Sequence, residues 1–477
     1  MYLGLDLGTS AVKAICIDGA TILATASAPL DISSPQSGWS EQAPTDWWDA
    51  TCAAIRMLGE SISLADIRAV GLSGQMHGAV LLDADQNVIR PAILWNDSRS
   101  VAECAVLQDA LPDVGTLAGI PPLPGFTAPK VMWLARHEPE AYSAIANILL
   151  PKDYIGFRLH GQMVTDPSDA AGTMWLNQST RDWEPRILAA TGTALEWLPA
   201  LHDGHDIVGT VTRDAAETTG LPSGIPVVAG GGDAATGAVS LGATEPGRGF
   251  VSLGTSGQLF VADRVYRPNP DQYVHAYAHT VPDRWFQMAA MLNGARPISW
   301  IGEQLDLTPG DVVSLAETAR ADRIPVFLPY LTGERSPHGD PHIRAGFFGL
   351  EDTTARSELC RAVVEAVAFC FADAAESFGP SMETLPKLFA IGGGSRSDFL
   401  LSLLATATGK PITRLQGADS GPAFGAAQLA ACGTGALAMQ DFGVSDTSGE
   451  TFDPNPDTGF ADRLDRFRAT YAALKSV

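Results

Sequence analysis

The fold is decided by the segment Tyr2-Leu3-Gly4-Leu5-Asp6-Leu7-Gly8-Thr9-Ser10 and by Val12-Lys13-Ala14-Ile15-Cys16-Ile17-Asp18, which follows it. An apolar strand carries an acid near its end, a tight turn of small residues follows, and a second apolar strand returns. A near copy of this pattern stands in the middle of the chain, as Phe250-Val251-Ser252-Leu253-Gly254-Thr255-Ser256-Gly257. Two such turns about one domain length apart predict a chain built from two similar halves.

The two turns are candidates for phosphate binding. Glycine leaves no side chain between the backbone amides and a bound anion, and each Thr-Ser pair adds hydroxyl donors. If the turns face each other across a cleft, they would hold the phosphates of one nucleotide. The alternatives are two ordinary hairpin turns and, for Lys13, a solvated strand residue. The candidate phosphate contacts are Gly8, Thr9, Ser10, Lys13, Gly254, Thr255 and Ser256.

Composition narrows the class of protein. The 477 residues suit two domains, which we expect at 1–245 and 246–477, with a boundary in the Pro-Gly segment 245–249. Asp and Glu outnumber Lys and Arg by 54 to 31, which argues against a nucleic-acid or anionic membrane surface. The chain shows no apolar run of membrane-spanning length and no signal-peptide pattern, and its six scattered cysteines are typical of a reduced core. We therefore expect a cytoplasmic protein that binds neither nucleic acid nor membranes.

The order of the predicted elements indicates an α/β fold. The spacing of apolar residues predicts strands at 3–6, 12–17, 22–29 and 69–73, and a helix at 47–58 that Thr45 or Asp46 would cap. In the second half the same criterion predicts a strand at 387–391 and helices at 355–378, 398–408 and 422–432. A last helix, docked on a core, is predicted by the stripe Phe460, Leu464, Phe467, Tyr471 and Leu474.

Two longer motifs are more specific than a glycine turn. They read Gly125-Phe126-Thr127-Ala128-Pro129-Lys130-Val131-Met132-Trp133 and Gly346-Phe347-Phe348-Gly349-Leu350, and the second continues to Glu358-Leu359 and Ala362-Val363-Val364-Glu365. In these motifs the chain resembles the FGGY family of sugar kinases, and the similarity runs through nearly all of its length. The resemblance implies the fold of actin and the heat-shock ATPases, in which two ribonuclease-H-like domains flank a catalytic cleft.

Within that family the chain is most similar to the xylulokinase members. The similar stretches include Gly74-Gln75-Met76-His77-Gly78, Leu94-Trp95-Asn96-Asp97, Leu150-Pro151-Lys152-Asp153-Tyr154 and Ser168-Asp169-Ala170-Ala171-Gly172-Thr173-Met174-Trp175. The resemblance implies ATP-dependent phosphorylation of D-xylulose, with Mg²⁺ as the companion cation. It assigns sugar contacts to Met76, His77 and Asp233, while Trp95, Asn96 and Asp97 offer an aromatic wall with polar neighbours, which suits a sugar. Trp95 alone could equally be a core residue.

The resemblance also assigns the general base to Asp233. This residue follows three glycines at a predicted strand-to-helix turn, where the helix N-terminus would keep its carboxylate ionised; the alternative is a plain N-cap. Asp6 ends a buried strand, where a carboxylate needs a cationic partner, so we expect it to hold Mg²⁺ directly or through water, with Asp233 as the second metal candidate. The alternative for Asp6 is a carboxylate bonded by the amides of Gly8 and Thr9.

The adenosine site implied by the resemblance is the loop Gly392-Gly393-Gly394-Ser395-Arg396, between a predicted strand and helix. Its candidate contacts are Gly393, Gly394, Ser395 and Arg396. Nearer the middle of the second half, Glu334 and Arg335 predict a local ion pair, and His275 and His279, four apart, have no third metal ligand nearby.

Two departures from the xylulokinase pattern put the exact sugar in question. Ala234 stands where many xylulokinases have Asn, and Ser98 stands where many have Gly. A kinase for another ketopentose or a polyol, such as D-ribulose or glycerol, therefore stays open, as does an actin-type or heat-shock-type ATPase that acts as a binding protein. A homodimer is also left open.

Overall fold

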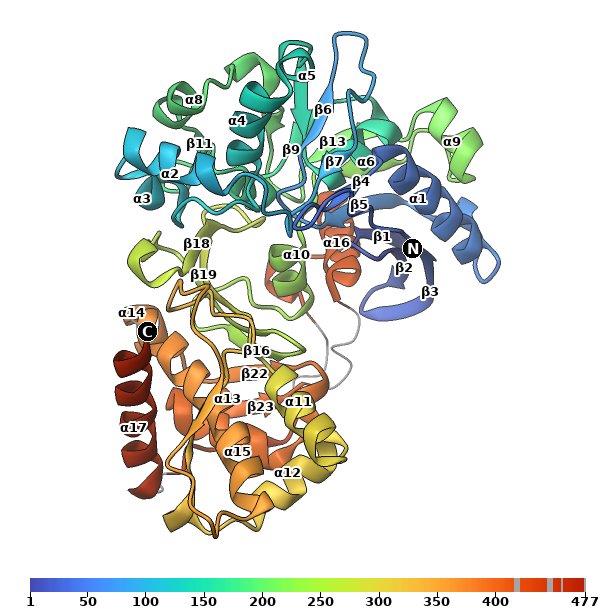
Figure 1. Ribbon diagram of the computed structural model, residues 1–477. Helices are drawn as coiled ribbons and strands as arrows, with labels where there is room; N and C mark the ends of the chain where they lie inside the picture. The colour runs from blue at the N-terminus through green and yellow to red at the C-terminus, as the bar shows by residue number, and fades with distance from the viewer. Residues whose placement is uncertain (416–420, 444–448, 456–457, 476–477) are drawn as a thin grey trace.

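Two seven-stranded sheets organise the computed structural model, which describes residues 1–415, 421–443, 449–455 and 458–475 (Figure 1). The first sheet has the order β13-β14-β5-β1-β2-β3, with β15 also paired to β5. Its strands are β1 (Tyr2–Leu7), β2 (Ala11–Asp18), β3 (Thr21–Pro29), β5 (Ala69–Gly74), β13 (Ile207–Thr210), β14 (Pro226–Val228) and β15 (Gly231–Gly232). The second sheet has the order β18-β19-β17-β16-β22-β23-β24. Its strands are β16 (Gly249–Leu253), β17 (Gly257–Asp263), β18 (His275–Ala278), β19 (Trp285–Met291), β22 (Leu388–Ile391), β23 (Ile412–Arg414) and β24 (Thr451–Phe452).

The two sheets share an arrangement of six strands, as the repeated turn predicts, while β15 in the first and β18 in the second have no counterpart. Strands β1, β2 and β3 form an antiparallel meander, and so do β16, β17 and β19. Two parallel strands then follow on the other side of each first strand, β5 and β14 beside β1, and β22 and β23 beside β16. An antiparallel strand closes each sheet, β13 in the first and β24 in the second.

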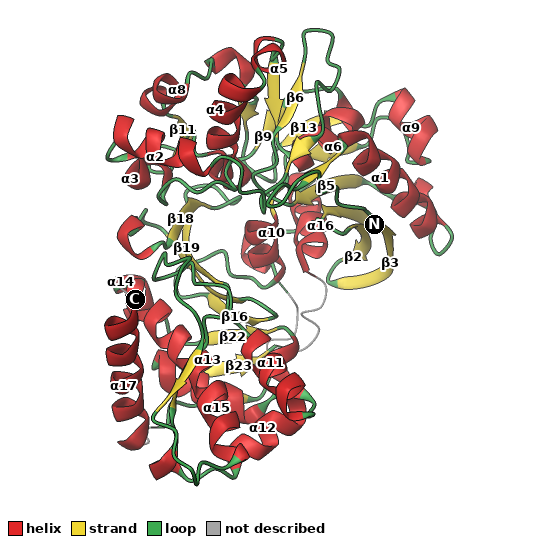
Figure 2. Cartoon of the chain, viewed as in Figure 1, coloured by secondary structure: helices red, strands yellow, loops and turns green. Residues whose placement is uncertain are grey.

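Helices and short strands complete the two lobes (Figure 2). Those of the first half are α1 (Pro44–Gly59), α2 (Val101–Ala110), α3 (Val114–Ala118), α4 (Thr127–His137), α5 (Pro139–Ser143), α6 (Pro151–His160), α7 (Pro167–Ala170), α8 (Pro185–Thr191), α9 (Arg213–Thr219), α10 (Asp233–Ser240), β4 (Glu41–Gln42), β6 (Val80–Leu82), β7 (Ala92–Ile93), β8 (Asn147–Leu149), β9 (Val164–Thr165), β10 (Leu176–Asn177), β11 (Asp182–Trp183) and β12 (Ala200–Leu201). Those of the second are α11 (Arg296–Leu305), α12 (Pro309–Glu317), α13 (Arg356–Ser377), α14 (Pro380–Glu383), α15 (Asp398–Thr408), α16 (Gly421–Gly433), α17 (Thr458–Leu474), β20 (Val326–Leu328) and β21 (Gly346–Phe348).

The predicted elements agree closely with these bounds, with one correction. Helix α1 begins at Pro44 after Ala43, so Thr45 and Asp46 lie inside its first turn and cap nothing. Proline suits the first helical position because its missing amide has no partner there in any helix. The C-terminal stripe is confirmed, because Phe460 and Phe467 on α17 are buried in the core of the second half.

Helix α16 belongs to the second half of the sequence, yet it packs on the first sheet. A Cβ at Gly4 of β1 would lie 1.8 Å from the carbonyl oxygen of Ala423, and one at Gly71 of β5 would lie 1.9 Å from that of Ala426. Both strands therefore need glycine where this helix crosses them. In Figures 1 and 2, α16 lies beside α10, between the two lobes.

A second link joins the halves through apolar side chains. Trp133 and Met174 from the first half share one buried cluster with Phe260 and Phe286 of the second sheet. All six cysteines carry free thiols. No helix in the described part of the chain is both long enough and apolar enough to cross a membrane.

Candidate active site

Two acids distant in sequence meet at one edge of the first sheet. In register, Asp6 on β1 lies beside Ser73 on β5, and Ser73 lies beside Gly231 on β15, two residues before Asp233. The Ser73 hydroxyl donates to Asp6 Oδ1 at 2.9 Å and lies 2.7 Å from the Thr236 hydroxyl of α10. Because the carboxyl ends of parallel strands meet at one edge, both carboxylates reach the same place.

Asp233 has an unusual acidity. Burial, followed by the charge of Asp6, raises the pKa of Asp233 to about 7, although the amide of Ala234 donates to its Oδ1 at 2.7 Å. The expected ionising effect of the helix N-terminus is therefore outweighed. Asp233 is nevertheless an exposed residue by its solvent-accessible surface, so water screens part of this shift. The N-cap alternative is wrong, because Gly232 is the N-cap and Asp233 is the first residue of α10.

Asp6 is partly buried, and burial raises its pKa, while the hydrogen bond from Ser73 and the charge of Lys13 on β2 oppose the shift. The amide of Gly8 donates to the carbonyl of Ala11 at 3.0 Å, so it does not hold the Asp6 carboxylate as the alternative required. Two carboxyl groups thus converge at one place, and their mutual repulsion favours a cation between them.

A hydrated magnesium ion fits this pair of acids. Among the residues that the structure describes, no group of three or more His, Cys, Asp or Glu side chains could hold a metal. Mg²⁺ is usually bound by one or two carboxylates, with water and substrate phosphates completing the octahedron, and not by an all-protein cage. Asp6 and Asp233 offer the donor set of such a shared site.

The first turn is tied to the neighbouring loops. The Thr9 hydroxyl donates to Gln75 Oε1 at 3.0 Å and accepts from the Trp95 indole at 2.9 Å, and Gln42 Nε2 donates to the Thr9 carbonyl at 2.8 Å. The Thr9 hydroxyl is thus engaged, so the backbone of the turn is the part that can contact a phosphate. Ser10 is exposed.

His77 is fixed in both backbone and ring. Its φ of 71° is left-handed, and its carbonyl accepts from Lys130 Nζ at 2.8 Å and from the Thr127 hydroxyl at 3.1 Å. Its Nδ1 lies 2.8 Å from the carbonyl of Gly172, and burial lowers the pKa of His77 to about 3. A neutral ring that donates through Nδ1 keeps Nε2 as an acceptor, which suits a sugar hydroxyl. Met76 packs against Gly232, where a Cβ would meet its side chain at 3.0 Å.

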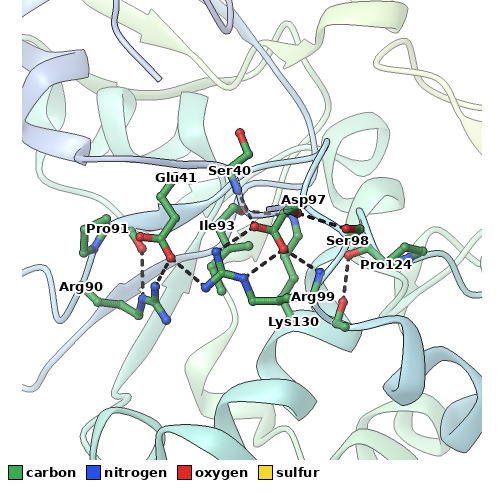
Figure 3. Close-up of polar contacts among 12 residues, drawn as sticks. Ser40, Glu41, Arg90, Pro91, Ile93, Asp97, Ser98, Arg99, Pro124 and Lys130 are labelled. Carbon is green, nitrogen blue, oxygen red and sulfur yellow. Dashed lines mark hydrogen bonds and ion pairs between the residues drawn. The ribbon is translucent and has the colours of Figure 1, made fainter. Parts of the chain in front are cut away.

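The loop 95–97 has two exposed residues and one buried residue, and Figure 3 shows the polar contacts of the buried one, Asp97. Trp95 is 40% exposed and Asn96 is exposed, whereas Asp97 is 2% exposed. The Asp97 carboxylate accepts from Arg99 Nε at 2.9 Å, from Arg99 Nη2 at 2.7 Å and from the Ser40 amide at 2.6 Å. Asp97 is therefore not placed as the sugar contact that the sequence predicted, because both of its carboxylate oxygens already accept hydrogen bonds from Arg99 and Ser40.

The buried pair belongs to a larger network. The guanidinium of Arg99 lies 3.6 Å from the ring centre of Trp39 and 2.7 Å from Glu41, which also pairs with Arg90 (Figure 3). Lys130 Nζ donates to the carbonyl of Ile93 at 3.1 Å, as well as to His77. This network fixes the loop 95–97 to the backbone of His77.

Five nucleotide candidates of the second half line a cavity of about 1090 Å³ in the second lobe, whereas Gly8, Thr9, Ser10 and Lys13 of the first half do not line it. These five are Gly254, Thr255, Gly393, Gly394 and Arg396. Ser256 and Ser395 do not line it: Ser256 is exposed, and the Ser395 hydroxyl donates to the carbonyl of Gly392 at 2.7 Å.

A further part of the cavity wall was not predicted from the sequence. It consists of residues from α11, from the N-cap of α11 and from α12, namely Ala295, Arg296, Ile298, Ser299, Glu303, Pro309, Gly310, Val313, Ser314 and Glu317. Helix α11 is fixed on the second turn, because the amide of Ala295 donates to the carbonyl of Gly254 at 2.8 Å and the amide of Arg296 to that of Thr255 at 3.2 Å. The one signal in the sequence was the Pro309-Gly310 pair, which indicates no more than a turn.

Comparisons with known proteins now identify the family. The N-terminal and C-terminal domains of the FGGY family of carbohydrate kinases match residues 1–240 and 249–434. The chain belongs to the FGGY family of carbohydrate kinases. The resemblance stated from the motifs is confirmed, and with it the two-domain α/β fold and the class of enzyme, a phosphotransferase.

Several proteins similar to this FGGY kinase are themselves named as kinases. The xylulose kinase of Escherichia coli K12 is 42% identical over 434 residues, which cover 90% of this chain and 89% of the relative. A solved structure named a xyloylose kinase from Brucella ovis is 41% identical, with a TM-score of 0.93 and coverage of 100% of this chain and 99% of that one. Another, named gluconate kinase from Lactobacillus acidophilus, is 27% identical with a TM-score of 0.92, covering 99% and 98%.

Two further expectations for this FGGY kinase concern residues outside the Asp6–Asp233 site and the nucleotide cavity. Glu334 and Arg335 make no ion pair, because the Glu334 carboxylate accepts from the Leu292 amide at 2.6 Å and from Asn293 Nδ2 at 3.0 Å. Burial lowers the pKa of both His275 and His279 to about 3, so both rings are neutral.

Proposed function

We propose that this FGGY kinase transfers the γ-phosphoryl group of ATP to D-xylulose, giving D-xylulose 5-phosphate. The observation that carries the proposal is the meeting of Asp6 and Asp233 at the strand edge that also holds Met76 and His77. The name of the Escherichia coli relative, a xylulose kinase 42% identical over 90% of this chain, supports this choice of sugar.

Asp233 is the general base in this proposal. Phosphoryl transfer to an alcohol needs close positioning, charge neutralisation and an acceptor for the hydroxyl proton. A base works best when its pKa lies near the working pH, and burial with the charge of Asp6 brings the pKa of Asp233 to about 7. The Nε2 of neutral His77 would accept a second sugar hydroxyl, and the exposed Trp95 and Asn96 would form the wall of the sugar site.

Asp6, through water, and Asp233 would hold Mg²⁺ in this proposal. When bound there, the cation would neutralise charge on the transferring phosphoryl group. The backbone of Gly8, Thr9 and Ser10 would face the terminal phosphates from the first half, while Gly254, Thr255 and Ser256 would do so from the second. The adenosine would take the cavity beside Gly393, Gly394 and Arg396. Lys13 and Ser395 remain outer candidates for this site.

We also propose that 1–245 and 246–477 act as two domains that close on the substrates, because transfer must keep water from the γ-phosphate. Helix α16 and the shared cluster around Phe260 and Phe286 tie part of 246–477 to the first half. We therefore expect the moving part to be the lobe that carries α11, α12 and α15. The free cysteines suit the reducing cytoplasm in which we place the enzyme.

The test is ADP release with D-xylulose, D-ribulose, glycerol and no acceptor, followed by NMR assignment of the phosphorylated carbon. We expect the highest kcat/KM for D-xylulose, a product phosphorylated at O5, and slow ATP hydrolysis without acceptor. A higher kcat/KM for D-ribulose or glycerol would replace the sugar but keep the reaction. Equal rates with and without acceptor would favour an ATPase and overturn the proposal.

A further inference from the structure

Arg335 is a mostly buried cation whose guanidinium has no acceptor in the described part of the chain. No hydrogen bond or ion pair reaches it, and its neighbour Glu334 is turned toward Leu292 and Asn293. A buried charge is costly unless it is paired and hydrogen-bonded. In a chain with a net charge of −23, a cation left in this state needs an explanation.

The groups around Arg335 are also unsatisfied. The hydroxyl of Tyr277, which is 1% exposed, and Nδ1 of His275, which is 4% exposed, are buried with no hydrogen-bond partner among the described residues. Both side chains stand on the same face of β18, two residues apart, with ring centres 5.4 Å from each other. Arg335 is held beside this strand by the next residue, because the Ser336 hydroxyl donates to the carbonyl of Tyr273 at 2.6 Å and accepts from the amide of Ala290 on β19 at 3.2 Å. Buried polar atoms without partners are uncommon in native proteins and mark a strained or ligand-binding place.

A row of rings connects this cluster to the sugar site. His275 lies 6.5 Å from Phe126, and Phe126 packs edge-on against His77 at 4.5 Å. The cluster of Arg335, His275 and Tyr277 therefore lies at the His77 end of the sugar site, on the side of the second sheet.

We propose that Arg335, Tyr277 and His275 form an oxyanion-binding subsite that adjoins the acceptor site at its His77 end. The inference rests on the proposed function for the position of that acceptor site. A guanidinium offers several N–H donors in a planar fork, which matches a carboxylate or phosphate, and the Tyr277 hydroxyl adds a further donor. A sugar hydroxyl would give the Arg335 guanidinium no charged acceptor, whereas one oxyanion would accept from the guanidinium and from the Tyr277 hydroxyl together.

The oxyanion can come from two sources, a free phosphate or the carboxylate of a sugar acid in the acceptor site. The probes are inorganic phosphate and D-xylonate, the five-carbon sugar acid. Their dissociation constants are measured calorimetrically without ATP, on the full chain saturated with ADP so that the nucleotide cavity is filled. Because no turnover is involved, the result is independent of whether D-xylulose is the natural acceptor.

We compare the wild type with Arg335→Gln, with Tyr277→Phe and with Arg320→Gln, in which an exposed arginine is changed. Tyr277→Phe removes only an unpaired hydroxyl, so it should fold at least as well as the wild type. We expect a probe to bind the wild type and the Arg320 variant equally, and Arg335→Gln to weaken it by about tenfold or more, with a smaller loss in Tyr277→Phe.

Competition then separates the two sources. Displacement of D-xylulose by D-xylonate would support an oxyanion carried by the acceptor. Phosphate binding that is lost in both variants, with D-xylulose affinity unchanged, would support a free anion. If neither probe binds the wild type at millimolar concentration, or if both bind the Arg335 and Tyr277 variants as tightly as the wild type, the subsite does not exist.

Discussion

The two Leu-Gly-Thr-Ser turns of this kinase have the same sequence and the same fold, but the strands that lead into them differ in charge. In the first half, Asp6 stands two residues before the glycine and is paired in register with Ser73. In the second half, Ser252 stands at the equivalent place and is paired with Ile391. The strand position two residues before the turn thus carries an acid in the first half and a hydroxyl in the second, although the surrounding strands are arranged alike.

The threonine hydroxyls of the two turns also differ in their surroundings. The Thr9 hydroxyl is held by Gln75 and Trp95, which ties the first turn to the loops of the proposed sugar site. Thr255 is exposed and lines the large cavity. A few changes at the strand ends can therefore give two copies of one hairpin different tasks. The first copy would serve the sugar, which needs a base, and the second would serve ATP, which carries several negative charges.

The largest expected effect is that of Asp233→Asn, which removes the acid from the first edge. Loss of a general base costs ~10²–10⁴ in kcat, measured here as ADP release with D-xylulose. The exposed Asp85 gives a control, because Asp85→Asn lies on a surface turn and should keep the wild-type rate. Turnover within a few-fold of the wild type in Asp233→Asn would remove that residue from the role of base.

The pH dependence checks the same residue. Because the pKa of Asp233 is raised to about 7, kcat/KM should climb as the pH rises through that value. The folded state binds a proton more tightly than the unfolded state here, so this group's contribution to stability declines as the pH rises from about 4 to about 7. Asp233→Asn should consequently raise Tm at pH 8 and leave it unchanged at pH 4. A lower Tm at pH 8 would contradict the electrostatic account.

Asp6→Asn should have the next largest effect. It keeps the size of the side chain and deletes the charge that would attract the hydrated cation, so we expect kcat to fall by about 10–100-fold and the Mg²⁺ concentration for half-maximal rate to rise. D-xylulose affinity, measured by calorimetry without nucleotide, should stay the same. Collapse of sugar affinity with an unchanged Mg²⁺ requirement would move Asp6 to the sugar site.

The reverse experiment gives the second turn the acid of the first. In Ser252→Asp a carboxylate would stand beside the cavity that we assign to ATP, and juxtaposed like charges are strongly unfavourable. The KM for ATP should rise about tenfold or more, while the KM for D-xylulose changes little. Ser252→Asn serves as the uncharged control. An unchanged KM for ATP would show that the second edge does not face the phosphates.

The smallest effect is expected for Ala234→Asn, which adds an amide next to the base. One new hydrogen bond to a sugar hydroxyl contributes about 0.5–1.5 kcal/mol, so kcat/KM for D-xylulose should rise by about 2–10-fold. Ala234→Leu controls for added bulk at the same position. No gain from the amide would mean that the acceptor does not reach residue 234.

The fold could be predicted from local patterns because they are strong in this chain. The hairpin around Gly8, its copy around Gly254 and the stripe of α17 each follow from spacing alone, and the structure confirms them. The pairing of α16 with the first sheet could not be read in this way. The sequence shows this pairing only as glycine at positions such as Gly4 and Gly71. The need for glycine there becomes clear only from the contact with α16, which is distant in sequence.

The site was predictable where a motif names the residue and not where burial decides its role. Asp6 was identified by its strand context and Asp233 through the family resemblance, whereas the buried state of Asp97 depends on Arg99 and Ser40. The α11–α12 wall of the nucleotide cavity has the composition of any amphipathic helix pair. The shift of Asp233 to a pKa of about 7 needs the three-dimensional proximity of Asp6.

The division of work between the two edges is tested most directly by calorimetric titration of two variants with D-xylulose and with ADP. His77→Ala removes a ring at the first edge, and Gly393→Ala adds a Cβ that meets no atom within 4 Å, so it projects into open space beside the nucleotide cavity without disturbing the fold. We predict that His77→Ala weakens D-xylulose binding by about 5–100-fold and spares ADP, while Gly393→Ala weakens ADP and spares the sugar. If His77→Ala weakens ADP and leaves D-xylulose unchanged, the assignment of the two edges is wrong.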